Sequence, residues 1–576
     1  MDLHITGPEG SAEERAAIDG AIGGARPRRD LLLPALLAVQ GRIGWVSRGA
    51  LNHISRRLDV PPAEAFGVAS FYHLLRLEEE PPQVTHVCDD IVCRLAGAEQ
   101  RCAELEARLG PPGTARDGAT WRRSPCLGLC ERAPAALILR AGPTPSHEVV
   151  AAARASVPQV GDPSLQLLRR VGRADPTSLS AYRATGGYLG LTRAVELGRE
   201  ATIAEVTASR LVGRGGAAFP TGRKWAAVAG QPERTRYLVC NADESEPGTF
   251  KDRILMEEDP FAVLEGMTIG AYATGAERGY LYIRGEYPEA AARMQRAIDT
   301  AAEAGLLGDD IGGAGFRFDV DIRRGGGAYI CGEETALFNS IEGRRGEPRN
   351  KPPFPVQAGL FGKPTVVNNV ETLVNVPLIL AEGAAAFAAV GSGGSTGPKL
   401  FCVCGQVERP GLYEAPFGTT LGQVLALAGG VAGGRPLRCV LLGGAAGSFV
   451  GPDRLDVPLT LEALRAIGAS LGSGVVMAVD DRADLGDLLL RIARFFRDES
   501  CGQCVPCRVG TVRQEELLHR LRAGRPHGDA ATEHAMLREL GQAMRDASIC
   551  GLGQTASIAI ESALLDLHID PSEGRS

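Results

Sequence analysis

Cysteines are the residues whose spacing most directly indicates chemistry, because eight of the fourteen in the chain are clustered. Cys501, Cys504 and Cys507 follow a C-x2-C-x2-C pattern, and Cys550 comes later in the chain. Three thiolates on a tight turn can ligate three corners of one cubane, and a fourth completes the ligation of a [4Fe–4S] cluster. A structural zinc site also takes four cysteines, but usually as two separate C-x2-C pairs. The spacing therefore favours a [4Fe–4S] cluster.

A second set of cysteines consists of two pairs, Cys88-x4-Cys93 and Cys126-x3-Cys130. The first pair follows a predicted strand and the second lies in a predicted loop, and four thiolates from two loops suit a [2Fe–2S] cluster. Zinc or a redox dithiol is the alternative, although neither has this spacing as its usual signature. The other six cysteines are scattered and are expected to be small buried hydrophobic residues: Cys102, Cys240, Cys331, Cys402, Cys404 and Cys439.

A glycine-rich loop lies between Leu211 and Trp225, with Gly213, Gly215 and Gly216 near its start. It approximates the dinucleotide-binding fingerprint, but that fingerprint must follow a strand, and the preceding segment TIAEVTASRLV has the pattern of a helix. An ordinary dinucleotide fold is therefore not expected here. Open backbone amides and the cation of Lys224 can still bind phosphate, whereas the alternative is a tight turn whose glycines serve packing.

Polar and charged residues also follow several predicted strands, at the position where α/β proteins bind ligands. Asn241–Arg253 begins at the end of the apolar segment RYLVCNA and carries Asp243, Glu244, Glu246 and Asp252. Gly325–Pro355 and Val366–Thr372 supply a further set, namely Gly332, Glu333, Glu334, Lys351, Asn368 and Asn369. If these loops converge, they fit the phosphate of a flavin with a nicotinamide nucleotide stacked on it.

Composition limits the broad class of protein. The chain has 576 residues, of which 44% are hydrophobic and 23% charged, so several packed domains are expected rather than disorder. The net charge of −7 and the pI near 5.9 argue against a nucleic-acid binder. The N-terminal residues contain no apolar signal-peptide core, and no apolar stretch is long enough to span a membrane. We therefore expect a cytoplasmic protein.

The pattern of elements predicts a multidomain α/β chain, whose helices and strands must position these residues. Helical patterning over residues 11–80 includes PAEAFGVASFYHLL, which Pro61 and Pro62 open as one helix. The segment from Lys399 is typical of a ubiquitin-like (SLBB) module, and amphipathic helices follow Leu485. The predicted regions are an N-terminal helical domain (1–82), a small α/β domain with the [2Fe–2S] cysteines (83–156), a linker and lead-in (157–189), an α/β domain (190–395), the ubiquitin-like module (396–482) and a C-terminal helical bundle with the [4Fe–4S] cysteines (483–576).

Several segments resemble one protein family closely. GRGGAAFPTGRKW, NADESEPGTFKDR, GAYICGEETAL, KPPFP, VNNVET, ESCGQCVPCR and SICGLG resemble the flavin- and NADH-binding subunit of respiratory complex I. Relatives of that subunit occur in NAD-dependent molybdenum or tungsten formate dehydrogenases and in NAD-reducing hydrogenases. FGVASFYHLLRL and the x4/x3 cysteines resemble the 24-kDa-type thioredoxin-like [2Fe–2S] subunit. Together the two resemblances span roughly residues 20–565.

The resemblance implies positions for both nucleotides. For FMN it implies Gly213, Gly215, Lys224, Asn241, Asp243, Ser245, Asn368, Asn369 and Thr372. For NAD(H) it implies Phe219, Lys224, Glu246, Tyr329, Glu334, Lys351 and Phe354, with the phenylalanines stacking on adenine. Glu244 is also expected beside the nucleotides, and Glu246 beside the ribose would repel a 2′-phosphate, which favours NAD over NADP. Ala218 stands in place of a glycine common in the family, and Ala227 in place of a third aromatic residue.

The two halves are usually separate polypeptides in complex I but are fused here. The fusion, the segment FGTTLGQVLALAGGVAGGRPLRCVLLGG and the motif GEETAL favour the beta (diaphorase) subunit of a formate dehydrogenase. Its partner would be a catalytic alpha subunit with molybdenum or tungsten pterin and further Fe–S clusters. The alternatives are a hydrogenase diaphorase subunit, the NADH-input module of an NADH:quinone oxidoreductase, and a non-enzymatic zinc-binding assembly module.

Overall fold

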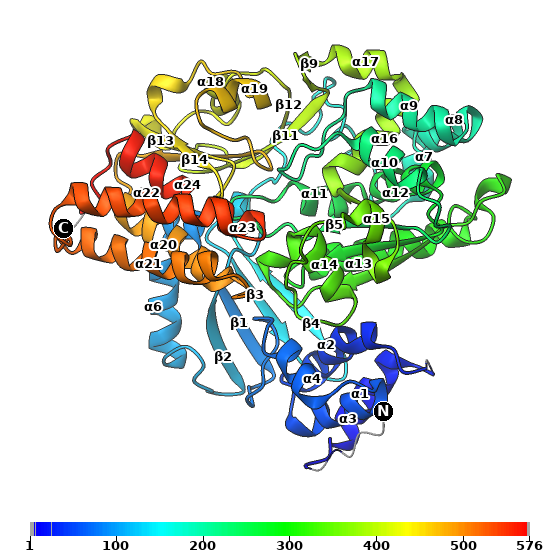
Figure 1. Cartoon of the computed structure of the whole chain (residues 1–576), viewed down its shortest axis with the longest axis horizontal. Coiled ribbons are helices and arrows are strands. Elements are labelled where there is room, and N and C mark those ends of the chain that lie inside the picture. The colour runs from blue at the N-terminus through cyan, green and yellow to red at the C-terminus, as the bar shows by residue number, and fades with distance from the viewer. Residues whose placement is uncertain (1–4, 6, 25, 573–576) are drawn as a thin grey trace.

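The computed structural model describes residues 5, 7–24 and 26–572. Four helices open the chain and pack beside the first sheet (Figure 1): α1 (Ala12–Ile22), α2 (Leu32–Ile43), α3 (Arg48–Leu58) and α4 (Pro62–Ala69). The helix that begins at Pro62 was expected to reach Leu75 but ends at Ala69. Beyond it, the N–H groups of His73 and Leu74 bond to the carbonyls of Gly327 and Gly326. Backbone pairing with a distant segment thus replaces the last helical turns.

The first sheet carries the N-terminal cysteines and has the strand order β2-β1-β3-β4. Its strands are β1 (Gln83–Cys88), β2 (Ala119–Ser124), β3 (Ala136–Arg140) and β4 (Ser146–Val150). β1 is parallel to β2 and antiparallel to β3. The helices α5 (Ile91–Leu95) and α6 (Ala98–Leu109) connect β1 to β2. The edge strand β4 is almost wholly exposed, which explains why its polar sequence gave no strand signal.

The segment that joins the two halves, residues 151–178, contains no helix or strand. It is nevertheless fixed at its centre, because the carboxylate of Glu414 accepts the backbone N–H groups of Gln166, Leu167 and Leu168 at 2.7, 3.0 and 2.9 Å. Gln159 exchanges two further hydrogen bonds with the backbone of Glu414. The linker is therefore an ordered strap attached to the ubiquitin-like module.

A parallel sheet of order β7-β6-β5-β8 forms the centre of the chain. Its strands are β5 (Tyr237–Ala242), β6 (Arg278–Ile283), β7 (Asp319–Arg324) and β8 (Thr365–Asn369). Around them lie α7 (Leu179–Ala184), α8 (Leu189–Leu197), α9 (Arg199–Ala208), α10 (Thr221–Ala229), α11 (Lys251–Glu258), α12 (Pro260–Thr274), α13 (Pro288–Glu303), α14 (Glu334–Ile341), α15 (Pro355–Ala358), α16 (Val370–Glu382) and α17 (Ala384–Ala389). Because all four strands run the same way, the loops after β5, β7 and β8 emerge at one edge.

A third sheet follows, with the order β12-β11-β15-β13-β14. It comprises β11 (Pro398–Gly405), β12 (Gly411–Pro416), β13 (Leu437–Leu442), β14 (Ser448–Val450) and β15 (Val475–Asp480), together with α18 (Leu421–Leu427) and α19 (Leu461–Ala466). The short hairpin β9 (Gly391–Ser392) and β10 (Ser395–Thr396) precedes it. This module lies against the parallel-sheet domain (Figure 1).

Helices close the chain and lie beside the first sheet (Figure 1): α20 (Leu485–Glu499), α21 (Val505–Arg522), α22 (Ala530–Ala547), α23 (Gly551–Thr555) and α24 (Ile558–Glu561). Arg94 after β1 binds Asp487 of α20 at 2.8 Å, and Arg491 binds Asp90 at 3.3 Å. These ion pairs join the two regions that carry cysteine clusters. Over the described residues, the length and hydropathy of the helices yield no candidate membrane span.

Candidate functional site

A cavity of about 410 Å³ opens at the carboxyl edge of the parallel sheet. Its walls combine the loop before α10, the loops after β5 and β7, the end of β8, two loops of the third sheet and the start of α23. Of the residues that the sequence analysis named, twelve line it: Gly215, Gly216, Asn241, Asp243, Glu244, Ser245, Glu246, Asp252, Tyr329, Gly332, Glu333 and Asn369. The parallel topology therefore brings the three predicted loops together.

The glycine loop lies directly before α10 and follows a helix, α9, rather than a strand. A Cβ at Gly215 would stand 3.1 Å from the Cβ of Asn369, and Gly216 has a φ of +117°. The N–H of Arg214 donates to Thr372 Oγ1 at 2.8 Å, which holds the loop against the start of α16. Because these glycines have no side chain, the backbone of the loop lies close to the cavity and is open to a ligand there.

Glu246 is a cavity carboxylate whose position is fixed by several contacts. Tyr329 Oη donates to it at 2.5 Å, and the N–H of Ala446 donates at 2.9 Å. Burial raises the pKa of Glu246 to about 7, although both hydrogen bonds act in the opposite direction. A Cβ at Gly444 would lie 2.6 Å from Cγ and Oε1 of Glu246. The third sheet therefore fixes the position of a side chain from the parallel-sheet domain.

Glu244 has a different role from Glu246. Its carboxylate accepts the N–H groups of Asp252 and Arg253 at the start of α11, at 2.9 and 3.0 Å. Burial raises the pKa of Glu244 to about 8. These contacts make it a structural cap of the loop as well as part of the cavity wall.

The remaining predicted residues do not line the cavity itself. Lys351 Nζ donates to Glu333 and Glu334 at 2.9 and 2.8 Å, and Lys224 lies 4.0 Å from Glu334. Two phenylalanines remain about half exposed, Phe219 at 49% and Phe354 at 52%. Phe66 is exposed to a similar extent, at 53%, so this exposure leaves the two rings available for stacking without by itself marking a binding surface.

Three predicted residues lie outside the cavity lining and hold neighbouring parts of the site in place: Gly213, Asn368 and Thr372. Asn368 Oδ1 accepts from the indole of Trp225 at 2.8 Å, Gly213 pairs with the backbone of Phe219, and Thr372 holds Arg214. Ala218, at the position where the family resemblance predicts a glycine, has a φ of +52°, so an alanine here occupies the left-handed region that glycine favours.

The cavity residues that come from the C-terminal half were not predicted from the sequence: Gly443, Ala446, Ser470, Gly472, Ser473, Gly551, Leu552 and Thr555. The glycine run LLGGAAG, Leu441–Gly447, was the available signal, since paired glycines after a strand mark a close backbone approach. Its start belongs to the segment that supports the family resemblance, and nothing in that resemblance placed it beside the nucleotides.

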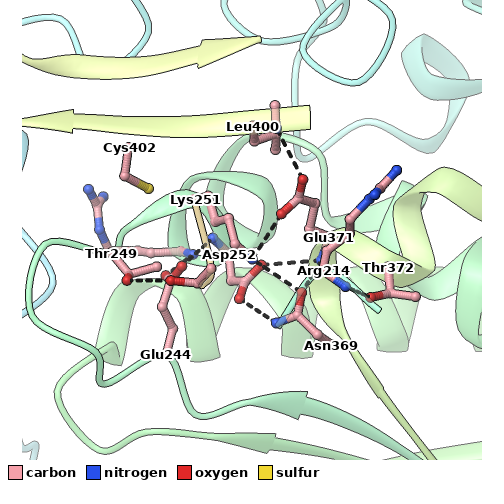
Figure 2. Close-up of polar contacts among 12 residues, drawn as sticks. Arg214, Glu244, Thr249, Lys251, Asp252, Asn369, Glu371, Thr372, Leu400 and Cys402 are labelled. Atoms are coloured by element: carbon pink, nitrogen blue, oxygen red, sulfur yellow. Dashed lines mark hydrogen bonds and ion pairs between the residues drawn. The ribbon is translucent and has the colours of Figure 1, made fainter. Parts of the chain in front are cut away.

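A fully buried network of charges joins the cavity to the third sheet (Figure 2). Lys399 of β11 donates to both oxygens of Glu371 at 2.9 and 2.7 Å, and Lys251 bridges Glu371 and Asp252 at 3.1 and 2.8 Å. Asn369 donates to Asp252 at 2.6 Å. Burial lowers the pKa of Lys399 to about 8, and the two lysines hold that of Glu371 below its usual range despite its burial. Two cations, Lys399 and Lys251, thus offset two anions, Glu371 and the cavity residue Asp252.

The four C-terminal cysteines come together around one small pocket. Cys501, Cys504, Cys507 and Cys550 line it, the first three around the start of α21 and the last just before α23. Ile330 and Leu552 line both this pocket and the larger cavity. In the part of the chain that the structure describes, no three His, Cys, Asp or Glu side chains are already set around a single metal position. The fit to a cluster therefore rests on the shared pocket and its four-thiol donor set.

The N-terminal cysteines are also gathered. All four are buried, Cys126 Sγ lies 3.4 Å from Cys130 Sγ, and the N–H of Gly128 points to Cys126 Sγ at 3.4 Å. Arg284 donates to the carbonyl of Cys126 at 2.6 Å and to that of Glu244 at 2.7 Å. One arginine thus links these cysteines to the cavity wall. The six scattered cysteines are all buried, as expected.

Four family descriptions match successive parts of the chain. They are the thioredoxin-like [2Fe–2S] ferredoxin (residues 18–146), the Nuo51 FMN-binding domain (206–378), the SLBB domain (400–443) and the NADH-ubiquinone oxidoreductase-F iron–sulfur binding region (487–568). The predicted multidomain α/β architecture and the predicted cofactors, FMN, NAD(H), [2Fe–2S] and [4Fe–4S], are confirmed.

Known proteins are similar to about two thirds of the chain or to nearly all of it. An F-type subunit of NADH-quinone oxidoreductase (F 2) from Rhizobium meliloti (strain 1021) is 47% identical over 400 residues, which are 69% of this chain and 94% of that protein. The NADP-reducing hydrogenase subunit HndC of Solidesulfovibrio fructosivorans is 43% identical over 413 residues, 70% and 83% of the two chains. A chain in the crystal structure of an air-oxidized NAD⁺-reducing [NiFe]-hydrogenase is 33% identical, with a TM-score of 0.79, and the match covers 95% of this chain and 93% of that one.

Proposed function

Since the chain belongs to the family of the F-type subunits of NADH-quinone oxidoreductase, with a thioredoxin-like [2Fe–2S] ferredoxin fused before it, we propose that the glycine-lined cavity is its diaphorase site. The protein is an NAD(H)-dependent flavin iron–sulfur oxidoreductase. The observation that supports this placement is that the cavity adjoins both sets of cysteines. Ile330 and Leu552 line both the cavity and the pocket of the C-terminal cysteines. Arg284 joins the cavity wall to Cys126.

The residues present fit the flavin and the clusters. Gly215, Gly216 and Gly332 leave backbone exposed along the cavity, and Asn241 and Asn369 bring amides to it. When bound, FMN would supply exchange of a hydride with NAD(H) and of single electrons with the iron–sulfur clusters. Cys501, Cys504, Cys507 and Cys550 would hold the [4Fe–4S] cluster, and Cys88, Cys93, Cys126 and Cys130 the [2Fe–2S] cluster.

The protein side chains bind and orient the nucleotides in this proposal, and none acts as a nucleophile. Phe219 and Phe354 are the exposed aromatic surface for the adenine, and Lys351 and Lys224 lie beside Glu334 near that surface. Glu246 and Glu334 position the ribose and nicotinamide. The hydrogen bonds from Tyr329 and Ala446 hold Glu246 in one orientation, which pre-organises the site.

The terminal partner is a separate proposal. We propose a catalytic alpha subunit of a molybdenum or tungsten formate dehydrogenase, supported by the fused halves and by the motif GEETAL. The nearly full-length match to a chain of an NAD⁺-reducing hydrogenase favours the second candidate, a hydrogenase diaphorase subunit. Affinity isolation of the native complex with metal analysis separates them, because molybdenum or tungsten supports the first and nickel the second. A membrane assembly would instead support an NADH:quinone oxidoreductase.

The cavity assignment can be tested on the purified chain. We expect flavin absorbance that NADH bleaches under anaerobic conditions, together with iron and acid-labile sulfide. A chain that is reconstituted with FMN and clusters but shows no bleaching by NADH would contradict the assignment. Zinc in place of iron would support the non-enzymatic alternative.

Replacing Glu246 with glutamine should relax the preference for NADH over NADPH. The carboxylate ionises near pH 7, so its repulsion of the 2′-phosphate should grow as the pH rises from about 6 to about 8. We expect kcat/KM for NADPH to rise about tenfold in Glu246→Gln at about pH 8, a change of about 1.4 kcal/mol. In this variant, the ratio of NADH to NADPH turnover should change with pH only as the 2′-phosphate of NADPH ionises, with a pKa of about 6. Unchanged NADPH turnover would remove this role from Glu246.

Replacing Gly444 with alanine should weaken nucleotide binding through Glu246. The new Cβ would meet Cγ and Oε1 of that side chain, so we expect KM for NADH to rise about tenfold, or about 1.4 kcal/mol. Gly430→Ala is the matched control, because Gly430 has a similar φ of +77° but nothing within 4 Å of the added Cβ. Steady-state kinetics with ferricyanide as acceptor measures both variants. A KM for Gly444→Ala equal to that for Gly430→Ala would contradict the prediction, because the clash with Glu246 would then have no effect on nucleotide binding.

A further inference from the structure

A second pocket lies where the N-terminal helices, the first sheet and the parallel-sheet domain meet. Its volume is about 180 Å³, slightly more than an engineered cavity of about 150 Å³ that binds benzene. Leu37 of α2, Leu74, Val84 of β1 and Leu139 of β3 form apolar walls. The pocket is separate from the diaphorase cavity, with which it shares no lining residue.

A buried histidine faces this pocket without a partner. Val84 and His86 alternate along β1 and both line the pocket, whereas Val87 packs on the opposite face with Cys102 and Trp121. His86 is 4% exposed, and no group in the described residues hydrogen-bonds to its imidazole. Its ring nitrogens are not among the fully enclosed side-chain atoms that lack a hydrogen-bond partner, so they are open to the pocket, where a polar ligand can bond to them.

The charged groups around the pocket leave an excess of positive charge. Glu80 is shared between Arg76 and Arg122, so two cations face one carboxylate. The Nε of Arg76 and the Oε2 of Glu80 face each other at 3.6 Å, and both are buried without a hydrogen bond. Arg324 also lines the pocket. It donates to the carbonyl of Gly285 at 3.2 Å, and no carboxylate among the described residues lies within ion-pair distance of it.

The other charges nearby are already neutralised within the protein. Arg140 pairs with Glu148 at 2.6 Å, and Glu286 pairs with Arg284 at 3.0 Å and His73 at 3.4 Å. A doubly negative ligand would therefore offset Arg324 and the one positive charge by which Arg76 and Arg122 together exceed Glu80. Arginine forks match phosphate and carboxylate groups well.

We propose that this interdomain pocket binds a small organic dianion, a phosphate monoester or a dicarboxylate, between Arg76, Arg324 and His86. Its carbon atoms would lie against Leu37, Leu74 and Leu139. The site connects two functional regions, because β1 ends at Cys88, and β7, which ends at Arg324, leads into the segment that carries Tyr329. A ligand here would tie the [2Fe–2S] domain to the flavin domain and stabilise their joined state by mass action.

Isothermal titration calorimetry of the FMN- and cluster-loaded chain tests the proposal, with inorganic phosphate and succinate as probes and chloride at matched ionic strength as the reference. We expect saturable binding of at least one probe, which also identifies the preferred head group. Arg324→Gln should weaken that binding about tenfold or more, since it removes a charge-assisted contact. Arg317→Gln, which changes an exposed arginine paired with Asp309 and Asp319, should leave it unchanged.

Thermal melting of the same variants gives an independent measurement. The probe should raise the melting temperature of the parent chain and of Arg317→Gln but not that of Arg324→Gln, and Arg324→Lys serves if the glutamine variant does not fold. No saturable binding of either probe, or equal binding in Arg324→Gln and the parent, would overturn the proposal. Failure of the diaphorase assignment is seen separately, as flavin that NADH does not bleach.

Discussion

Replacing Lys399 with methionine should lower the free energy of unfolding by about 3–5 kcal/mol. The substitution removes one of two cations from a fully buried network and leaves Glu371 and Asp252 to share Lys251. The effect is large because a buried carboxylate that loses its partner keeps its desolvation cost. Urea denaturation of the cofactor-loaded chain, followed by far-UV circular dichroism, measures the loss.

Two further variants separate burial from charge. Lys363→Met breaks an ion pair of 2.6 Å with Glu233, but both side chains are more than a third exposed, so we expect a loss of about 0–1 kcal/mol. The double variant Lys399→Met/Glu371→Gln removes one charge of each sign and should recover part of the single variant's loss. If Lys399→Met is as mild as Lys363→Met, the buried network does not hold the third sheet against the flavin domain.

Replacing Cys504 with alanine should remove the [4Fe–4S] cluster and leave the other cofactors. Iron should fall from about six to about two atoms per chain, because one cluster of four irons is lost and the [2Fe–2S] cluster stays. Bleaching of the flavin by NADH should persist, since the cavity shares only the apolar Ile330 and Leu552 with the cysteine pocket. Iron and sulfide analysis with electron paramagnetic resonance measures both outcomes.

Cys439→Ala is the matched control for this experiment. Cys439 is buried in β13 and lies in neither cysteine set. The iron content of the Cys439→Ala variant should therefore equal that of the parent chain. Cys126→Ala should give the complementary result, a loss of about two irons. An unchanged iron content in Cys504→Ala, or zinc bound by the parent chain, would refute the ligand assignment.

Local chemistry made part of the site predictable from sequence. Cysteine spacing reflects the shape of a cluster, so Cys501, Cys504 and Cys507 stand out without any knowledge of the fold. The loops after β5 and β8 were predictable because an apolar strand followed by polar residues marks the ligand-binding edge of a parallel sheet. The order of the large regions followed in the same way from changes in hydrophobic periodicity.

Long-range packing made the rest unpredictable. Gly443 and Ser473 reach the cavity from loops of the third sheet, and nothing in their immediate sequence specifies which distant domain they approach. Lys399 lies on a strand whose alternation alone gives no reason to bury a lysine. Its burial is explained by its contacts with the carboxylate of Glu371 and with the carbonyls of Leu400 and Ser473. The early end of α4 at Ala69 has the same origin, since its cause is the pairing of the following residues with a distant glycine segment.

The strap formed by residues 151–178 has a consequence for how the two halves stay together. Glu414 fixes the part of the strap that belongs to the C-terminal half, through three backbone N–H groups. Because Arg284, Arg491 and Arg253 join the two halves directly, the covalent connection is not the main bond between them. A single proteolytic cut in the strap near Arg154 should leave both fragments in one particle during gel filtration. The peptide link guarantees equal numbers of the two halves, and the non-covalent contacts supply their alignment.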